Sequence, residues 1–204
     1  MLKIIGTSHI SRESIEEINE AFKDHEFDIV AVELDRSRLL ALKSQKGGGV
    51  TARNPIALVM SAVQNYLSKK TGITPGTEML EAVEKAEQHN TKVFLLDQDI
   101  AITMSRLKDV SLKEKVKIAG YGLLGLLGKN AVQFDITKVP PEDFIKYILV
   151  QFRVMFPGFY RVLIEERNIY MARRIKELDK KYEDVLVVVG AGHKPGIEDL
   201  IDQE

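Results

Sequence analysis

One apolar run near the end of the chain constrains the fold more than any other feature. Residues 185–189 read Val-Leu-Val-Val-Val, and the turn Gly190-Ala191-Gly192 leads directly into His193. A run that is apolar at every position predicts a strand buried on both faces, as in a parallel sheet covered by helices. The glycines permit a sharp turn or a close backbone approach. His193 is therefore expected at the carboxyl end of a rigid strand, where α/β proteins commonly build ligand sites.

The amino end of the chain repeats this arrangement. Residues 2–5 are predicted to form a strand, and Gly6-Thr7-Ser8-His9 follows it. Both ends of the sequence thus carry Gly-x-x-His at the carboxyl end of a strand. The two histidines can share a ligand only if the first and last strands lie close together in the sheet, and this adjacency is the main structural expectation.

Four apolar segments separated by helical patterns define the expected fold class. The predicted strands cover residues 2–5, 27–33, 92–96 and 185–189. This alternation predicts an α/β fold with a mainly parallel central sheet of about four strands and helices packed around it. The chain is interpreted as a single domain, 1–204, with an all-helical insertion at about 100–181 before the last strand.

Composition excludes several classes of protein. The net charge is −1, from 29 basic and 30 acidic residues, and gives no reason to expect a nucleic-acid partner. Without cysteine the chain has neither disulfides nor thiolate metal ligands. Its longest apolar stretch, residues 118–127, is about half the ~20 residues needed to cross a bilayer. We therefore expect a cytoplasmic, soluble chain.

Polar residues follow each predicted strand and form the candidate site. Glu33 comes after four apolar strand residues, and a carboxylate buried there needs a partner. With His9 and His193 it makes a set of two histidines and one carboxylate, which is typical of catalytic metal sites. We interpret three further acids as helix caps after strands, namely Asp35, Asp97 and Asp99.

A polar pair interrupts the apolar stripe of the helix that precedes the last strand. Asn168 lies on the stripe formed by Ile164, Met171 and Ile175, and Arg167 lies at its edge. One interpretation is an Asn with a satisfied hydrogen bond at the edge of the core beside a snorkelling Arg. The other is a pair that holds a substrate carboxylate or orients a metal-bound water. The sequence pattern leaves both open.

Several motifs together resemble the TraB/PrgY family, named for plasmid pheromone-shutdown proteins and similar to the Tiki and GumN proteins. The Tiki and GumN signature is two Gly-x-x-His motifs, an acid and an Arg-Asn pair. The resemblance covers essentially the whole chain in order. It is carried by Gly6-Thr7-Ser8-His9-Ile10-Ser11, Val32-Glu33-Leu34-Asp35 with Arg38, Pro75-Gly76-Thr77-Glu78-Met79, Leu96-Asp97-Gln98-Asp99, Glu166-Arg167-Asn168 and Gly190-Ala191-Gly192-His193 with Pro195-Gly196.

The resemblance implies roles for individual residues. Tiki relatives are regarded as metal-dependent proteases, so His9 and His193 are expected to bind a divalent metal (Mn, Co or Zn). Glu33 is expected to bind the metal or act as a general base. Arg167 and Asn168 are expected to contact the substrate or the transition state. Further substrate contacts are assigned to Ser8, Arg38, Asp97, Asp99 and Gly192.

Two features depart from the family pattern. Many TraB members have an arginine between the two aspartates, where this chain has Gln98. Many also continue into a membrane-associated C-terminal region, so this chain is expected to be a short member or the soluble part of a membrane-associated protein.

The leading functional hypothesis is a metal-dependent peptidase or related hydrolase acting on a peptide or small-molecule substrate. The alternative is a non-catalytic protein that binds or sequesters a pheromone-like peptide. A homo-oligomer formed through the apolar helix at 118–127 is a third hypothesis.

Overall fold

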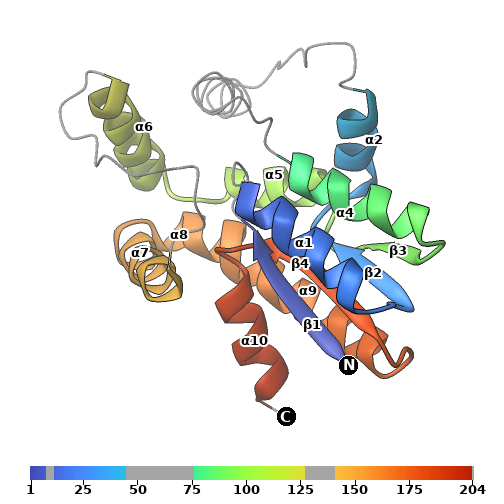
Figure 1. The fold of residues 1–204 in the computed structure, drawn as a ribbon. Helices are drawn as coiled ribbons and strands as arrows, with labels where there is room; N and C mark the ends of the chain where they lie inside the picture. Colours follow the sequence, from blue (N-terminus) through green and yellow to red (C-terminus); the bar gives the residue numbers. More distant parts are fainter. Residues whose placement is uncertain (8–11, 45–75, 127–140, 204) are drawn as a thin grey trace.

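The computed structural model describes residues 1–7, 12–44, 76–126 and 141–203 (Figure 1). Ser8 and His9, two of the predicted site residues, lie outside these ranges. Within the described chain, the elements form a central sheet with helices on both faces, and further helices extend to one side.

The sheet has four strands: β1 (Leu2–Thr7), β2 (Ile29–Val32), β3 (Lys92–Leu95) and β4 (Val185–Gly190). All pairings are parallel, and the strand order is β1-β4-β2-β3. The predicted fold class is therefore confirmed. The expected adjacency of the first and last strands is confirmed as well, because β1 pairs with β4 from Leu2 opposite Val185 to Thr7 opposite Gly190.

The central position of β4 explains its uniformly apolar sequence. Side chains on a strand alternate between the two faces of a sheet. Leu186 and Val188 belong to one hydrophobic cluster, whereas Val185, Val187 and Val189 belong to another. Every residue of β4 is buried, so no position is available for a polar side chain that faces water.

Different helices supply the two clusters. On one face lie α1 (Arg12–Asp24), α2 (Arg36–Ser44) and α4 (Thr77–Gln88), with Ile18 and Met79 fully packed against the sheet. The other face is covered by α9 (Glu166–Asp179) and α10 (Lys194–Asp202). Figure 1 shows this arrangement of helices around the sheet.

The remaining helices lie between β3 and β4. They are α5 (Ile100–Lys108), α6 (Leu112–Leu126), α7 (Glu142–Met155), α8 (Pro157–Tyr160) and a π-helical segment, η2 (Arg161–Glu165), which runs directly into α9. A third cluster centred on Phe156, Phe159 and Val162 holds them together. Phe156 separates two of these helices, because α7 ends at Met155 and α8 begins at Pro157.

The carboxylate of Glu114 connects two of these helices. Its Oε2 accepts hydrogen bonds from the backbone amides of Gly158 (2.8 Å) and Phe159 (3.3 Å) at the start of α8. Carboxylates are favoured there because the first amides of a helix have no partner within it.

Among the described helices, none combines the length and the apolar character needed to cross a membrane.

Candidate functional site

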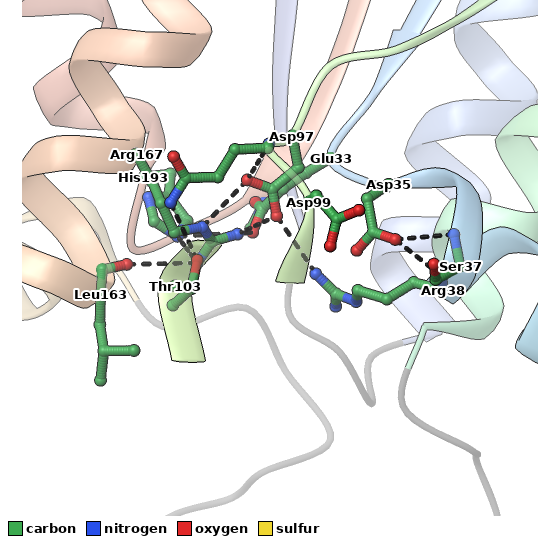
Figure 2. Close-up of polar contacts among 12 residues, drawn as sticks. Glu33, Asp35, Ser37, Arg38, Asp97, Asp99, Thr103, Leu163, Arg167 and His193 are labelled. Carbon is green, nitrogen blue, oxygen red and sulfur yellow. Dashed lines mark hydrogen bonds and ion pairs between the residues drawn. The ribbon is translucent and has the colours of Figure 1, made fainter. Parts of the chain in front are cut away.

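The candidate site lies where the carboxyl ends of β2, β3 and β4 meet (Figure 2). Glu33 follows β2 immediately, Asp97 comes shortly after β3, and His193 lies in the turn after β4. Arg167 approaches them from the beginning of α9. Glu33, Asp97 and His193 are all buried.

Glu33 has the partners that its burial requires. Its Oε2 accepts a hydrogen bond of 2.7 Å from the backbone amide of Gly190, the last residue of β4. Its Oε1 accepts a hydrogen bond from Nη2 of Arg167. One oxygen is therefore bound by the backbone of the sheet, and the other is bound by the Arg167 side chain in the site.

Arg167 is the centre of the polar network. Its Nε and Nη2 donate to the two oxygens of Asp97 at 3.1 and 2.8 Å, and Nη2 also donates to Glu33. Its Nη1 donates to the carbonyl of Leu163 at 3.2 Å and to Nε2 of His193 at 2.9 Å. A guanidinium has five N–H groups, so these five contacts use its full capacity. Lysine could not reproduce this planar fork.

Charge balance keeps Arg167 ionised although its side chain is only 13% exposed. Burial alone would lower the pKa of Arg167. Attraction by the Glu33 carboxylate and the hydrogen bonds and charge of Asp97 outweigh that effect and raise the pKa above its ordinary value. The guanidinium is therefore a permanent cation in the site.

The π-helical segment η2 directly precedes the helix that carries Arg167. The backbone amide of Glu166 donates to the carbonyl of Arg161, five residues earlier, instead of four as in an α-helix. The carbonyl of Leu163, inside this segment, accepts the Arg167 side chain. Single π turns within helices often occur at functional sites. The sequence Arg-Val-Leu-Ile-Glu gives no indication of the π turn.

Each ring nitrogen of His193 has a partner with only one possible hydrogen-bonding role: Oδ1 of Asn168 can only accept, and Nη1 of Arg167 can only donate. Its Nδ1 lies 2.6 Å from Oδ1 of Asn168, and its Nε2 lies 2.9 Å from Nη1 of Arg167. Because a guanidinium can only donate, Nε2 must accept. The proton of the neutral ring therefore resides on Nδ1, and this N–H group donates a hydrogen bond to Oδ1 of Asn168.

Two acceptor atoms, one from His193 and one from Glu33, consequently face the guanidinium group of Arg167. Nε2 of His193 and Oε1 of Glu33 are 3.4 Å apart, and both bind the Arg167 guanidinium. Two ligands placed about 2.1 Å from one ion at a tetrahedral angle also lie about 3.4 Å apart. The donor types and spacing therefore fit two ligands of a divalent cation, and a metal would have to take over the position of the guanidinium.

A complete metal site needs more than this pair. Within residues 1–7, 12–44, 76–126 and 141–203, no three His, Cys, Asp or Glu side chains are grouped as metal ligands. His9 is the further ligand predicted by the sequence, and it lies outside these ranges. Its motif starts beside that of His193, because the amide of Ala191 donates to the carbonyl of Thr7 at 2.8 Å. A Cβ on Gly6 would also lie only 2.9 Å from Cδ of Lys194.

The outer part of the site contains Arg38 and the predicted capping residues. Nη1 of Arg38 lies 3.4 Å from Oδ2 of Asp97, and its side chain is 36% exposed. Asp35 accepts from the amides of Ser37 (2.7 Å) and Arg38 (3.0 Å) at the start of α2. Asp99 accepts from the amide of Ala101 (2.8 Å) and caps α5. The capping interpretation is confirmed for Asp35 and Asp99.

Asp97 differs from these two acids. Although its Oδ1 also accepts from the amide of Gln98 at 2.8 Å, both of its oxygens bind Arg167. The sequence pattern favours a helix cap at Asp97, and its position shortly after β3 is the signal that could have indicated a role in the site. Gln98 donates to Thr103 Oγ1 at 2.9 Å, so it is bonded inside the α5 region.

The structure brings together five of the residues predicted for the site: Glu33, Asp97, Arg167, Asn168 and His193. Gly192 lies in the turn before His193 with space beside it, since a Cβ there would come no closer than 4.0 Å to Leu149. Sequence reasoning missed the amide of Gly190 and the carbonyl of Leu163. Backbone groups leave no mark in a sequence, so no pattern could have identified them.

Comparison with known proteins agrees with this layout. The family model described as TraB/PrgY/gumN matches residues 2–204. An uncharacterized protein of Methanocaldococcus jannaschii is 35% identical over 95% of this chain and 51% of its own length. TraB domain-containing proteins of Bos taurus and Homo sapiens are 25% and 23% identical over 96% of this chain and 61% of their own lengths. The chain thus spans about half to three-fifths of these relatives.

Proposed function

This chain belongs to the TraB/PrgY/gumN family, and we propose that it is a metal-dependent peptidase or related hydrolase. The observation that supports this proposal is the pair of acceptors formed by His193 Nε2 and Glu33 Oε1, which are 3.4 Å apart and face one cation. Imidazole and carboxylate are the ligands that catalytic Zn sites use, and they also suit Mn and Co.

His193 and Glu33 would hold the metal, with His9 as the further ligand predicted by the sequence. A bound divalent ion would supply polarisation of a substrate carbonyl and a lowered pKa for water. Arg167 would give up its bond to His193 Nε2 when the ion binds. Its other edge would stay in place, because Asp97 accepts from both Nε and Nη2.

The side chains of this chain would then divide the remaining work. Glu33, whose Oε2 is fixed by the amide of Gly190, can serve only one role at Oε1: it would either bind the ion or, if other groups hold the ion, accept a proton as a general base. The Nη1 group of Arg167 would donate hydrogen bonds to the oxyanion that develops on the substrate. Arg38, partly exposed at the outer edge, would bind a carbonyl or carboxylate of the substrate.

Metal analysis combined with peptide cleavage tests this proposal. Purified protein is incubated with Mn, Co or Zn, its metal content is measured, and a diverse peptide pool is searched for cleavage products. His193→Ala and Glu33→Gln should lose both metal and cleavage. Glu87→Gln, at an exposed carboxylate paired with Lys43, is the matched control and should retain both. Absence of bound metal and of any cleavage would refute the proposal.

Exposed apolar side chains favour a second candidate function, the binding of a peptide without cleavage. Val154 on α7 is 73% exposed and Val116 on α6 is 65% exposed, and α7 has no buried residue. Peptide binding that persists in Glu33→Gln and His193→Ala, with no turnover in the unmodified protein, would support this alternative.

A further inference from the structure

A close contact between two helices lies directly behind His193. Gly196 is in the first turn of α10, and a Cβ built there would collide with Nδ2 of Asn168 on α9 and lie 3.4 Å from its Cγ. Glycine inside a helix costs about 1 kcal/mol relative to alanine. The contact with Asn168 gives a physical reason for glycine at this position.

Asn168 is held on several sides by this packing. It is buried on the apolar face of α9, in the same row as Met171 and Ile175, and the nitrogen end of its carboxamide lies against Gly196. The oxygen end accepts the hydrogen bond of 2.6 Å from Nδ1 of His193. Both ends of the carboxamide are therefore in contact with other parts of the protein.

The start of α10 places His193 and Gly196 on one side. His193 is the N-cap of α10, and its carbonyl accepts from the amide of Ile197 at 3.0 Å. Residues three apart share a face of a helical turn. His193 and Gly196 therefore lie on the same face of α10. The absence of a side chain at Gly196 leaves space there, and Asn168 occupies that space.

We propose that Asn168 and Gly196 are positioning residues that hold His193 as the Nδ1–H tautomer. The oxygen of Asn168 accepts a hydrogen bond from Nδ1–H, so the lone pair of Nε2 points toward Glu33 and Arg167. Arg167 requires the same tautomer from the opposite side, because its Nη1 can only donate. Metal ligands are commonly oriented in this manner by a partner of the second ring nitrogen.

This assignment changes the role that the family resemblance implied for Asn168, from a substrate contact to a support for His193. It also adds Gly196, which has no role in the proposed chemistry. The tautomer itself follows from the hydrogen bonds, whereas its value for metal binding rests on the proposed function.

Nuclear magnetic resonance of the full chain labelled with 15N-histidine tests the proposal. Long-range 1H–15N correlation spectra distinguish the protonated from the unprotonated ring nitrogen, and His193→Ala identifies the resonances among the four histidines. The unmodified protein should show His193 with the proton on Nδ1 only. A proton on Nε2, or a mixture, would overturn the proposal whatever the variants do.

Two substitutions with opposite expectations extend the test. Asn168→Asp keeps an acceptor at the same place and should retain the Nδ1–H tautomer. Asn168→Leu removes the acceptor, and His193 should then lose the single tautomer. A variant Asn168→Leu that is folded and still shows only Nδ1–H would refute the role of Asn168.

Gly196→Ala tests the helix contact, with Gly120→Ala as the matched control. A Cβ at Gly196 would meet Asn168, whereas a Cβ at Gly120 in α6 would meet nothing within 4 Å. Gly196→Ala should disturb the His193 signals and Gly120→Ala should leave them unchanged. Equal spectra for both variants would refute the role of Gly196.

Metal titration separates this inference from the proposed function. If a metal binds, Asn168→Leu should weaken its affinity about 10–100-fold, while Asn168→Asp should weaken it less. Loss of the tautomer in Asn168→Leu without any metal binding by the unmodified protein would support the positioning role and count against the metal-dependent hydrolase.

Discussion

The two ends of the sheet each carry a histidine paired with a carboxylate, and their surroundings differ. At the carboxyl end, His193 and Glu33 are 7% and 4% exposed and share the Arg167 guanidinium. At the amino end, His25 and Asp184 lie 2.7 Å apart with side chains that are 37% and 31% exposed. The same two types of residue thus form a buried network in one place and a hydrated surface pair in the other.

This difference shows that burial determines how many hydrogen-bonding or charged partners a histidine–carboxylate pair needs. Water reaches both His25 and Asp184, and Asp184 also lies 3.3 Å from the ammonium group of Met1, so the pair does not depend on buried partners. Glu33 is removed from water, and it requires the amide of Gly190 and the charge of Arg167. A buried cluster is therefore expected to be sensitive to the loss of one member, whereas an exposed pair should tolerate it.

Removal of the central cation should have the largest effect on stability. In Arg167→Met, Glu33 and Asp97 would remain buried without a positive partner, and the free energy of unfolding should fall by about 3–5 kcal/mol. Urea denaturation at neutral pH measures this change. Arg161→Met, at a 55% exposed side chain 3.5 Å from Glu166, is the control and should change it by less than about 0.5 kcal/mol. Similar losses in both variants would contradict the comparison.

Neutralising one acid of the buried network should have an intermediate effect. Glu33→Gln keeps the shape of the side chain but weakens its bonds to Gly190 and Arg167, with an expected loss of about 1.5–3 kcal/mol. Glu87→Gln breaks an exposed ion pair with Lys43 and should cost about 0–1 kcal/mol. Urea denaturation at low and high salt gives both values, and only the Glu87 effect should diminish with salt. A Glu33 effect that also disappears in salt would contradict the burial of this carboxylate.

The pH dependence of stability should be the smallest effect and should come from the exposed pair. The hydrogen bond from His25 lowers the pKa of Asp184 below its ordinary value. A lowered pKa stabilises the folded state above the unfolded-state pKa of about 3.9, and this contribution disappears as the pH falls through the lower folded-state pKa. Asp184→Asn should therefore be less stable than the unmodified protein at pH 6, and the difference should vanish in acid. The free energy of unfolding is measured for both proteins from pH 6 to pH 2. A difference between them that stays constant over this range would contradict the prediction.

Arg167 should contribute no corresponding change at alkaline pH. Its pKa is raised in the folded protein, so its contribution is fully present below the unfolded-state pKa and would be lost only above the folded-state pKa. Both values lie beyond about pH 12. Between pH 8 and pH 10, the stability difference between the unmodified protein and Arg167→Met should consequently stay constant, which urea denaturation across that interval measures.

The sequence predicts the sheet because its signals are local. The run at 185–189 is apolar at each position since β4 is flanked by two strands and covered on both faces. The repeated Gly-x-x-His indicates that β1 and β4 are neighbours, and the structure pairs them. Glu33, Arg167 and His193 are identifiable because a charged or titratable residue beside a buried element needs a partner.

Other parts of the site depend on three-dimensional approach. The π turn at η2 and the bond from Arg167 to the Leu163 carbonyl involve backbone geometry that no residue type specifies. For Asn168, the apolar stripe is compatible with a core hydrogen bond and with substrate binding. Only the distance of 2.6 Å to His193 and the contact with Gly196 distinguish these two interpretations.

The strand order has a consequence for the synthesis of the protein. β4 lies between β1 and β2, so β1 has no neighbouring strand within the described sheet until residues 185–190 have been made. Glu33 likewise lacks the amide of Gly190 until then. A nascent chain on the ribosome must therefore hold β1 and β2 with unpaired edges, which is a state prone to aggregation. Folding of the described sheet is expected to be completed only after β4 has emerged from the ribosome, and chaperone dependence should be concentrated in the interval before that point.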